Sequence, residues 1–293
     1  MTKHQAGFVN IIGKPNVGKS TLMNALTGEN ISIITPKAQT TRQRILGIVN
    51  EENYQIVFSD TPGILQPQYR LQQAMMREVE SAFEDADIIL YLVEAGEMPE
   101  QNDIAERIIK TELPVILIIN KIDLTDQAAL ENKINRWQEI FPTADIIPVS
   151  ALLKANLQSV FRSILEKLPE NPPYYDKDEL TDKTVRYFVA EKIREKILLN
   201  YQKEIPYSVE VAVDQFKESD NLIHIIAYIF IARESQKAIL LGHQGSAIKR
   251  VGTQARRDLE EWLGKKIFLE LSVKVLKDWR DSEKELRKFG YDL

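Results

Sequence analysis

The segment Gly13-Lys14-Pro15-Asn16-Val17-Gly18-Lys19-Ser20 constrains the fold of this chain more than any other feature. An apolar run, Phe8–Ile12, precedes it, and Ser20–Leu26 has the composition of a helix. A glycine-rich loop between a buried strand and a helix, ending in Lys-Ser, is typical of proteins that bind a nucleoside triphosphate. Its backbone N–H groups form an anion site at the positive end of the following helix.

The residues after this loop alternate between short apolar runs and helical patterns. This order predicts an α/β fold in which a mostly parallel sheet carries helices on both faces. The ligand is expected at the carboxyl ends of the strands. The predicted strands are Gln55–Ser59, Ile88–Val93, Val115–Asn120 and Ile146–Pro148, and the predicted helices are Leu71–Glu84, Asp103–Thr111, Gln127–Ile140 and Ala155–Leu168.

Length and composition narrow the class of protein. A chain of 293 residues predicts two domains, and 44% hydrophobic with 28% charged residues is ordinary for a soluble protein. The absence of cysteine excludes disulfides and cysteine-bound zinc. Met1–Gln5 is too short for a signal peptide before the first strand, and no apolar run could span a bilayer, so we expect a cytoplasmic protein. The net charge of −5 does not by itself indicate nucleic-acid binding.

Three groups of residues predict the chemistry of the phosphate site. The charge of Lys19 suits the β- and γ-phosphates, and the Ser20 hydroxyl suits Mg²⁺. Asp60 follows a buried strand, where it would support the metal, and the amide of Gly63 would contact the γ-phosphate. A hydroxyl between the first helix and the second strand would complete the metal shell, which we assign to Thr41 rather than Thr40 without excluding Thr40. The alternative interpretation is that residues 39–43, which include both threonines, form a solvated polar loop without a metal contact.

Asn120-Lys121-Ile122-Asp123 predicts which base is bound. Guanine presents two adjacent donors, N1–H and the exocyclic amine, and one carboxylate such as Asp123 can accept both. Adenine lacks that pair of donors. Asn120 is expected to brace the loop, the Lys121 stem to lie along the base, and the N–H of Ala151 to bind the guanine carbonyl.

The expected site is therefore a complete GTP and Mg²⁺ site. Lys19, Thr41 and Gly63 are the expected catalytic residues, and Ser20, Thr41 and Asp60 the expected metal ligands. The residues expected to contact GTP or GDP are Gly13, Lys14, Pro15, Asn16, Val17, Gly18, Lys19, Ser20, Thr21, Asp60, Thr61, Pro62, Gly63, Asn120, Lys121, Asp123, Ser150, Ala151 and Leu152.

The pattern changes after a proline-rich, charged stretch. We predict a nucleotide-binding domain over 1–170, a linker over 171–182 and a second domain over 183–293. The second domain has the order α-β-β-α-α-β, and a short charged helix closes the chain. Its predicted elements are Thr184–Asn200, Ser208–Phe216, Ile223–Ala232, Ser235–Leu241, Ser246–Leu263, Ile267–Val275 and Ser282–Lys288.

Gly242-His243-Gln244-Gly245, between two predicted helices, indicates an RNA site. Residues 233–274 hold nine Lys/Arg against five Asp/Glu, although the chain as a whole is acidic. A Gly-x-x-Gly turn lets backbone approach a sugar-phosphate strand, but a helix C-cap is the commoner explanation of the glycines. Trp262, Phe268 and Trp279 are expected to be core or cover rather than base-stacking platforms, and His224 to be structural. The expected RNA-binding residues are Gly242, His243, Gln244, Gly245, Lys249, Arg250 and Arg256.

Together these signatures resemble the TRAFAC class of GTPases. Ile64 stands where many members carry a glutamine that orients the attacking water, so the chain is similar to the hydrophobic-substituted branch. Within that branch it resembles the Era family over its whole length, because its second half looks like a type II KH domain. The tRNA-modification and tandem-domain families resemble it less, since the chain has one Gly-Lys-Ser loop and no cysteine.

The resemblance to the Era family implies a specific role. It implies a monomeric, slowly hydrolysing GTPase that binds the 3′ region of 16S rRNA and acts in assembly of the 30S ribosomal subunit. It also implies peripheral contact with the inner face of the cell membrane, and K⁺ stimulation through Asn16. The alternatives are a GTPase acting on another RNA, a membrane-associated signalling GTPase, or a protein whose output is hydrolysis itself rather than an RNA-binding state.

Overall fold

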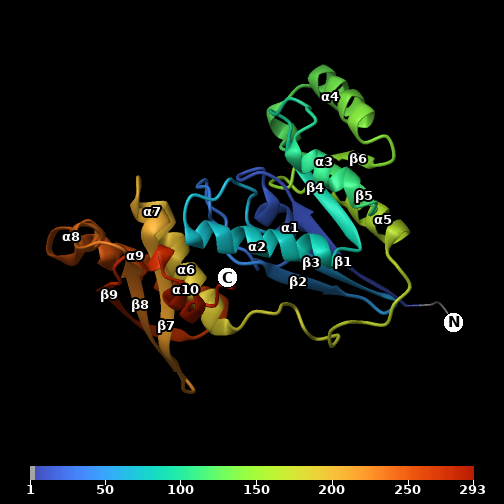
Figure 1. The fold of residues 1–293 in the computed structure, drawn as a ribbon. Coiled ribbons are helices and arrows are strands. Elements are labelled where there is room, and N and C mark those ends of the chain that lie inside the picture. Colours follow the sequence, from blue (N-terminus) through green and yellow to red (C-terminus); the bar gives the residue numbers. More distant parts are fainter. Residues whose placement is uncertain (1–3) are drawn as a thin grey trace. The chain divides into compact units, whose positions relative to one another are not determined.

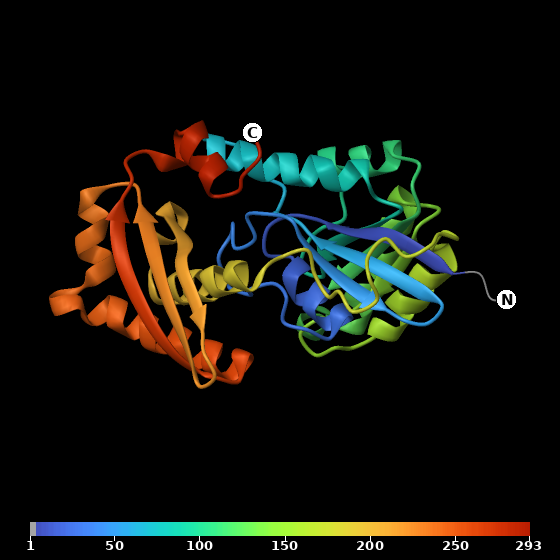
Figure 2. The ribbon, with the colours of Figure 1, turned by 90° about the horizontal axis from the view of Figure 1, so that it is seen from below.

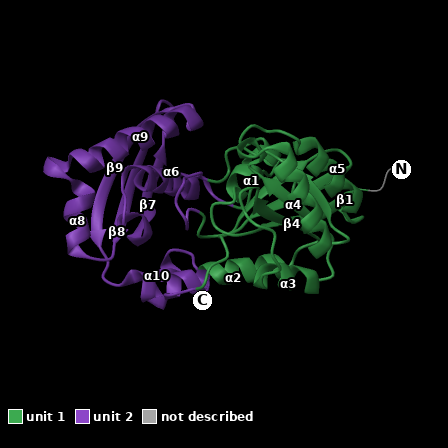
Figure 3. Cartoon of the chain, turned by 90° about the horizontal axis from the view of Figure 1, so that it is seen from above, with its two compact units in different colours: residues 1–32, 41–66, 75–182 green, residues 33–40, 67–74, 183–293 purple. Residues whose placement is uncertain are grey.

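The structure, a computed structural model, describes residues 4–293, and the chain divides into two compact units (Figure 3). The first unit contains residues 1–32, 41–66 and 75–182, and the second contains residues 33–40, 67–74 and 183–293. Residues 1–3 are not described. The prediction that the chain has no signal peptide concerns mainly these residues and lies outside the described part of the chain. The second unit includes two short segments from the part of the chain predicted to bind the nucleotide.

A six-stranded sheet forms the centre of the first unit, in the order β2-β3-β1-β4-β5-β6 (Figure 1). Five strands are parallel, and β2 pairs antiparallel with β3. The near-continuous apolar sequences of the inner strands follow from their being covered on both faces. The strands are β1 (Gln5–Ile12), β2 (Ile45–Asn50), β3 (Tyr54–Asp60), β4 (Ile88–Glu94), β5 (Val115–Asn120) and β6 (Asp145–Pro148).

Strand β2 is absent from the sequence-based prediction. It lies at the edge of the sheet and joins β3 through Glu51–Asn53, so it breaks the alternation of strand and helix on which the prediction rested. Gly47 in this strand allows α1 (Lys19–Thr27) to pack closely, because a Cβ atom there would lie 2.7 Å from the Met23 Cε.

Helices cover both faces of this sheet. On one face α2, α3 and α4 share a core with β1, β4 and β5 that includes Phe83, Ile108, Leu117 and Trp137. On the other face α1 and α5 pack together (Figure 2). None of the helices within residues 4–293 is long and apolar enough to cross a membrane. The remaining helices of this part of the chain are α2 (Arg70–Glu84), α3 (Asp103–Lys110), α4 (Gln127–Ile140) and α5 (Leu157–Lys167).

The segment that we predict as a linker, 171–182, groups with the first unit. Its backbone continues the hydrogen bonding of the edge strand, since the Ile48 N–H donates to the Leu180 carbonyl at 2.9 Å. The Leu46 N–H donates to the Asp182 carboxylate at 2.9 Å. The Tyr175 N–H donates to the side-chain carbonyl of Gln55 at 3.0 Å. The segment is therefore held along β2, and it also protects the open edge of the sheet.

The second unit contains a three-stranded sheet in the order β7-β8-β9, with β7 antiparallel and β9 parallel to β8. One face of this sheet packs against α6 and α9 around Val189, Ile193, Ile229 and Val251. The order α-β-β-α-α-β agrees with the prediction, and the single turn α7 is an addition. The elements are α6 (Val185–Asn200), α7 (Ile205–Ser208), β7 (Val209–Glu218), β8 (Leu222–Ile231), α8 (Glu234–Leu241), α9 (Ser246–Leu263), β9 (Lys266–Val275) and α10 (Glu283–Lys288).

Candidate nucleotide-binding and RNA-binding sites

The loop between β1 and α1 requires glycine at two positions, because a side chain at either one would clash with its neighbours. A Cβ atom at Gly13 would lie 2.4 Å from the Leu92 carbonyl oxygen. Gly18 has a φ of +102° and lies so close to Asn120 that a Cβ atom would be 2.3 Å from its Nδ2. Asn16, with a φ of +64°, is exposed at the tip of the loop. The turn before α1 is thereby closed tightly enough to present successive N–H groups to an anion.

Lys19 is buried beneath this loop. Its ammonium donates to the carbonyl of Gly13 at 3.1 Å and to that of Lys14 at 2.9 Å. Burial lowers the pKa of Lys19 to about 8, although the charge of Asp60 opposes the change. Because the cost of burying this charge is only partly offset within the chain, an anionic phosphate at the loop would restore favourable charge pairing.

Three oxygen-bearing side chains meet beside Lys19. The Ser20 hydroxyl donates to Asp60 Oδ2 at 2.7 Å, and the Thr41 hydroxyl donates to the same oxygen at 3.1 Å. The two hydroxyls are 3.0 Å apart. Oxygen ligands around one carboxylate are the set that Mg²⁺ prefers.

Asp60 itself favours a cation at this position. It is fully buried, and burial raises the pKa of its carboxyl above the usual range, against the opposing effects of the Ser20 hydrogen bond and the Lys19 charge. Its Oδ1 has no hydrogen-bond partner among residues 4–293. A buried carboxylate oxygen without a partner is costly, so these residues fit a metal ion.

The structure distinguishes the two candidate threonines by their contacts. Thr41 reaches Ser20 and Asp60, whereas the Thr40 hydroxyl donates to the Lys37 carbonyl at 2.7 Å and lies 2.6 Å from the Thr35 hydroxyl. The Thr41 hydroxyl therefore lies beside the other predicted metal ligands, whereas the Thr40 hydroxyl is bonded within its own loop.

Gly63 lies directly against the phosphate loop. A Cβ atom at this position would be 2.6 Å from the Pro15 Cα, and the next N–H, that of Ile64, donates to the Gly13 carbonyl at 3.2 Å. The Ile64 side chain is half-buried and packs on the core shared by α2, α3 and α4. It cannot orient a water molecule by hydrogen bonding. The Thr61 hydroxyl, two residues before Gly63, donates to the Ile11 carbonyl at 2.7 Å and fixes the start of the segment that holds Gly63.

Asn120 braces two loops of the predicted base site. Its Nδ2 donates to the Val17 carbonyl at 2.9 Å, and its Oδ1 accepts from the Ala151 N–H at 3.0 Å. The second bond uses the Ala151 N–H, the group that we expect to bind the guanine carbonyl. Asn120 thereby connects the loop after β6 to the phosphate loop, and the contact of Ala151 with guanine stays a prediction.

The Asp123 carboxylate is held in place by Ser150, another residue of the predicted base site. The Ser150 hydroxyl donates to Asp123 Oδ1 at 2.5 Å and accepts the Leu153 N–H at 3.2 Å. An exposed carboxylate with a fixed orientation is suited to bidentate pairing with two parallel donors. Lys121 has a φ of +64° and forms an ion pair with Glu94 at 2.9 Å.

The other residues expected at the nucleotide lie around these positions with various exposures. Lys14 is half-exposed and forms ion pairs with Glu97 and Glu100. Val17 and Pro62 are buried, Thr21 is half-buried and Leu152 is exposed. The structure therefore brings the predicted phosphate, metal and base groups to the carboxyl ends of the parallel strands.

The Gly-x-x-Gly turn lies between α8 and α9 and has positive φ angles at three of its four positions. The φ angles are +70° at Gly242, +49° at Gln244 and +75° at Gly245. A Cβ atom at Gly242 would lie 2.6 Å from that of Ala247, whereas nothing lies within 4 Å at Gly245. His243 and Gln244 are exposed, so the turn presents its backbone and two polar side chains to solvent at the start of α9.

A groove of about 300 Å³ runs between α9 and β9, next to this turn. Its apolar floor suits unstacked bases and its cationic rim suits phosphates. Lys249 and Arg256 belong to the predicted RNA site and line the groove, and Arg250 is exposed on the same helix. The lining residues are Ile248, Lys249, Gly252, Thr253, Arg256, Ile267, Phe268, Leu269 and Leu271.

Phe268, which is expected to be core or cover, does not belong to the core of the second unit. The core side of β9 is formed by Ile267, Leu269 and Leu271, so Phe268 points away from it and is 50% exposed. Its ring stacks on His224 of the paired strand, with centroids 4.7 Å apart and planes at 13°. The position of Phe268 on the face opposite the core could have been found from the period-two pattern of the strand.

The two tryptophans expected as core or cover have different environments. Trp279 is fully buried, and its indole N–H donates to the Ser208 carbonyl at 3.0 Å. Trp262 is 47% exposed and packs edge-on against Phe188 at 5.7 Å. Trp279 is therefore a core residue, and Trp262 covers the surface between α6 and α9.

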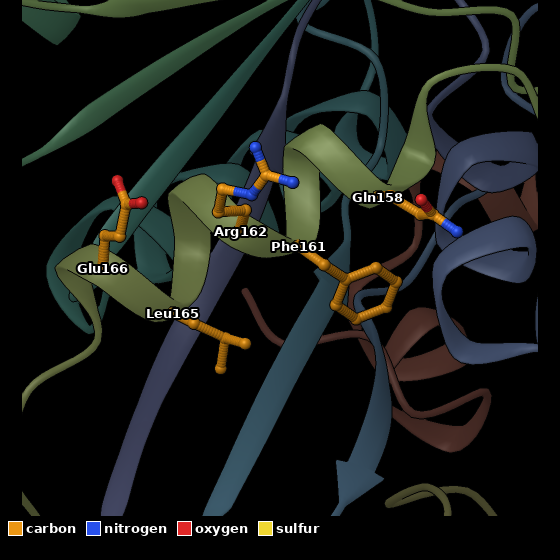
Figure 4. Close-up of a pocket in the computed structure, with 5 residues that line it drawn as sticks. All are labelled: Gln158, Phe161, Arg162, Leu165 and Glu166. Carbon is orange, nitrogen blue, oxygen red and sulfur yellow. The ribbon is translucent and has the colours of Figure 1, made fainter.

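One further cavity, of about 490 Å³, lies on α5 (Figure 4). It is lined by Phe161 and Leu165 with three polar side chains, Gln158, Arg162 and Glu166. No residue predicted for nucleotide, metal or RNA lines it. It plays no part in the sites described above.

Comparison with known proteins is consistent with both sites. Residues 8–121 match the family described as 50S ribosome-binding GTPase, and residues 204–280 match the KH domain family. The chain is 45% identical over 297 aligned positions to the GTPase Era of Geotalea daltonii, with all of both chains covered. It is 45% identical to the GTPase Era of Syntrophus aciditrophicus, covering 98% of this chain and 95% of the relative.

Two solved structures are similar over nearly the whole length. One is a crystal structure of Era in complex with MgGDPNP and nucleotides 1506–1542 of 16S ribosomal RNA, with a TM-score of 0.94 and 40% identity. The other is an Aquifex aeolicus Era variant bound to GDP and AlF4⁻, with a TM-score of 0.93 and 40% identity. Each match covers 99% of this chain and all of the other.

Proposed function

The chain belongs to the Era family of GTPases, and from this premise we propose that it is a GTP-controlled RNA-binding factor in assembly of the small ribosomal subunit. Its RNA would be the 3′ region of 16S rRNA, and hydrolysis would serve as a timer. The observation that carries the proposal is the full-length similarity to an Era bound to both MgGDPNP and 16S nucleotides. We place this activity in the cytoplasm, and the peripheral membrane contact implied by the family remains a prediction.

The nucleotide would be held by groups at the carboxyl ends of the parallel strands. Loop amides and Lys19 would neutralise the phosphates, and Asp123 would accept the two guanine donors. Ser20, Thr41 and Asp60 would hold Mg²⁺, which supplies positive charge at the β- and γ-phosphates when bound. Such groups stabilise the transferring charge most effectively when the fold holds them in position.

The reaction is attack of water on the γ-phosphorus of GTP, in line with the departing GDP oxygen. Lys19 and the amide of Gly63 would stabilise the charge on the transferring phosphoryl group, and the proton of the water passes to the phosphate product. Because Ile64 offers no hydrogen bond to that water, we expect slow turnover in the absence of an activator. Slow turnover suits a timer better than a protein whose output is hydrolysis.

The division of the chain supports a switch. Segment 33–40 ends next to Thr41, and segment 67–74 begins four residues after Gly63, yet both segments belong to the second unit, which carries the Gly-x-x-Gly turn. Ordering of Thr41 and Gly63 on the γ-phosphate and its metal would therefore act on residues that pack with the RNA-binding unit.

The proposal is tested by measuring affinity for an RNA with the sequence of the 16S 3′ end, with GDPNP and with GDP. We expect binding at least several-fold tighter with GDPNP, and weak binding of a scrambled RNA of equal length. Equal affinity in the two nucleotide states would refute the switch. A strong preference for a different RNA, found by crosslinking to total RNA, would favour the alternative of another RNA target.

Substitution of the second glycine of the turn should separate the two sites. Gly245→Asp adds a negative charge where a phosphate backbone would approach, so RNA affinity should fall at least ~10-fold, about the cost of one unfavourable charge contact. GTP affinity should be unchanged. Gly264→Asp is the matched control, because Gly264 has a similar φ of +67° and equally open space, at the other end of α9. Equal RNA affinity of the two variants would contradict the assigned site.

Potassium is the further cofactor that we propose. Asn16 is exposed with left-handed backbone at the tip of the phosphate loop, and its side-chain oxygen can serve as a cation ligand. We expect faster GTP turnover in K⁺ than in Na⁺ at equal ionic strength, and loss of that difference in Asn16→Ala. Equal turnover in the two salts would remove K⁺ from the mechanism.

A further inference from the structure

Helix α6 carries a fully buried arginine in the second unit. Arg194 is 1% exposed. Its guanidinium donates two hydrogen bonds to the carboxylate of Glu191, one turn earlier on the helix. Nε donates to Oε1 at 2.7 Å, and one terminal nitrogen donates to Oε2 at 2.5 Å. Glu210, which is also buried and accepts from the Tyr291 hydroxyl at 2.7 Å, adds a second negative charge nearby. The guanidinium is thereby fixed in one orientation by a planar two-point contact.

The same terminal nitrogen of Arg194 also donates to the backbone carbonyl of Thr40. Both residues belong to the second unit. The Thr40 side chain is held as well, through Thr35 and Lys37, so this end of segment 33–40 is fixed both by its side chain and by its backbone.

The next residue along the chain is Thr41. The Thr40 carbonyl and the Thr41 nitrogen belong to one planar peptide group, so fixing the carbonyl oxygen also fixes the direction in which the Thr41 backbone departs. The Thr41 hydroxyl then lies 3.0 Å from that of Ser20 and 3.1 Å from Asp60 Oδ2. A single peptide plane therefore connects Arg194 to the group that would hold the metal.

Stability alone is a poor explanation for this arginine. Replacing a buried ion pair by apolar side chains of similar volume is often neutral or stabilising. One N–H-bearing nitrogen of Arg194 is also buried without a partner among the described residues, which adds a desolvation cost. The contact that an apolar residue could not replace is the hydrogen bond to the Thr40 carbonyl.

We propose that Arg194 is a positioning residue for GTP hydrolysis, which holds the Thr40 carbonyl so that the Thr41 hydroxyl is ready to join Ser20 and Asp60 around Mg²⁺. This inference rests on the proposed function, since it assumes that Thr41 is a metal ligand in the triphosphate state. GDP binding does not need that ligand. Loss of Arg194 should therefore affect the triphosphate state and leave GDP affinity unchanged.

The test measures the Mg²⁺ concentration needed for half-maximal binding of a fluorescent GDPNP analogue to the full chain. We expect Arg194→Met to raise it about tenfold, near the value of one charge-assisted hydrogen bond. GDP affinity should stay within twofold, and turnover at low Mg²⁺ should fall in parallel with analogue binding. Arg194→Lys should give an intermediate Mg²⁺ requirement, because a single ammonium group cannot make the two-point contact of a guanidinium. Arg186→Met, on the exposed side of the same helix, is the matched control and should change nothing.

Two further variants separate this role from folding. Arg194→Met leaves Glu191 buried without its partner, so the double variant with Glu191→Met restores an uncharged interior and carries the test if the single variant is unstable. An unchanged Mg²⁺ requirement in the double variant, with a raised one in Thr41→Ala, would refute Arg194 as a positioning residue and leave the proposed function intact. An unchanged requirement in Thr41→Ala would refute both the metal assignment and this inference.

Discussion

Lys19→Ala is expected to lower affinity for GTP by at least ~100-fold. Removing one partner of a buried, hydrogen-bonded charge pair costs about 2–5 kcal/mol, or roughly 30- to 5,000-fold in affinity. Lys19 is buried beneath the phosphate loop. Without its charge, only the backbone amides of the loop would face the phosphates. Titration of a fluorescent GTP analogue at fixed Mg²⁺ measures the loss. Lys110→Ala, on an exposed turn of α3, is the control and should bind normally.

Lys19→Ala should not lower the free energy of unfolding, because burial of the Lys19 ammonium is unfavourable in the native chain. Unfolding midpoints of the variant and the unmodified chain are therefore expected to be similar. A Lys19→Ala chain that unfolds at the same midpoint and still binds GTP at the original affinity would contradict the assigned role.

The same lysine predicts a pH dependence of binding. The pKa of Lys19 is about 8 without nucleotide, and a bound triphosphate would raise it. Below about pH 8 the free chain already carries the proton, and affinity is at its maximum. Above that value the free chain must take up a proton to bind, so GTP affinity should fall with rising pH. Lys19→Ala should lack this decline, and an identical decline in that variant would assign it to another group.

The parts of the site that could be predicted are those fixed by the geometry of a parallel sheet. The loop at Gly13 and the residue Ser150 come just after strands, and Asp60 and Asn120 are the last residues of theirs. Parallel strands bring their carboxyl ends to one edge. Because the strand order is set by right-handed crossovers, four signatures separated along the sequence meet without further information. The sheet of the second unit could be predicted for a similar reason, since its apolar alternation determines the buried face.

The parts that could not be predicted depend on packing between distant segments. Arg194 and Glu191 lie on α6 beside apolar positions, where charged side chains are normally solvated, yet both are buried, and Arg194 donates to the carbonyl of Thr40, 154 positions away in the sequence. Strand β2 has no helix after it, so alternation could not reveal it. Residue type alone left Phe268 as either core or cover, and the pleat of β9 decides this because it puts the side chain on the face opposite the core.

Asp123→Asn is expected to reverse the base preference of the site. The carboxylate would accept both N1–H and the amine of guanine, whereas an amide offers one acceptor and one donor group. Guanine then meets a donor facing its own amine, and an unpaired polar contact of this kind costs about 2–5 kcal/mol. Xanthine carries a carbonyl where guanine has the amine, so an amide side chain pairs with it at both positions. GTP affinity should fall ~100-fold, and XTP should bind more tightly than GTP.

The exchange of preference separates a base contact from general damage, because a disturbed loop would weaken both nucleotides. Ser150→Ala supplies that comparison. It removes the hydroxyl that holds Asp123 Oδ1 at 2.5 Å, so it should weaken GTP modestly without favouring XTP. Asp126→Asn makes the same chemical change three residues away, at the N-cap of α4, where asparagine caps equally well and both affinities should be unchanged. If Asp123→Asn keeps the original ratio of GTP to XTP affinity, base choice lies elsewhere. The fixed orientation of Asp123 would then serve only to hold the loop at Ser150.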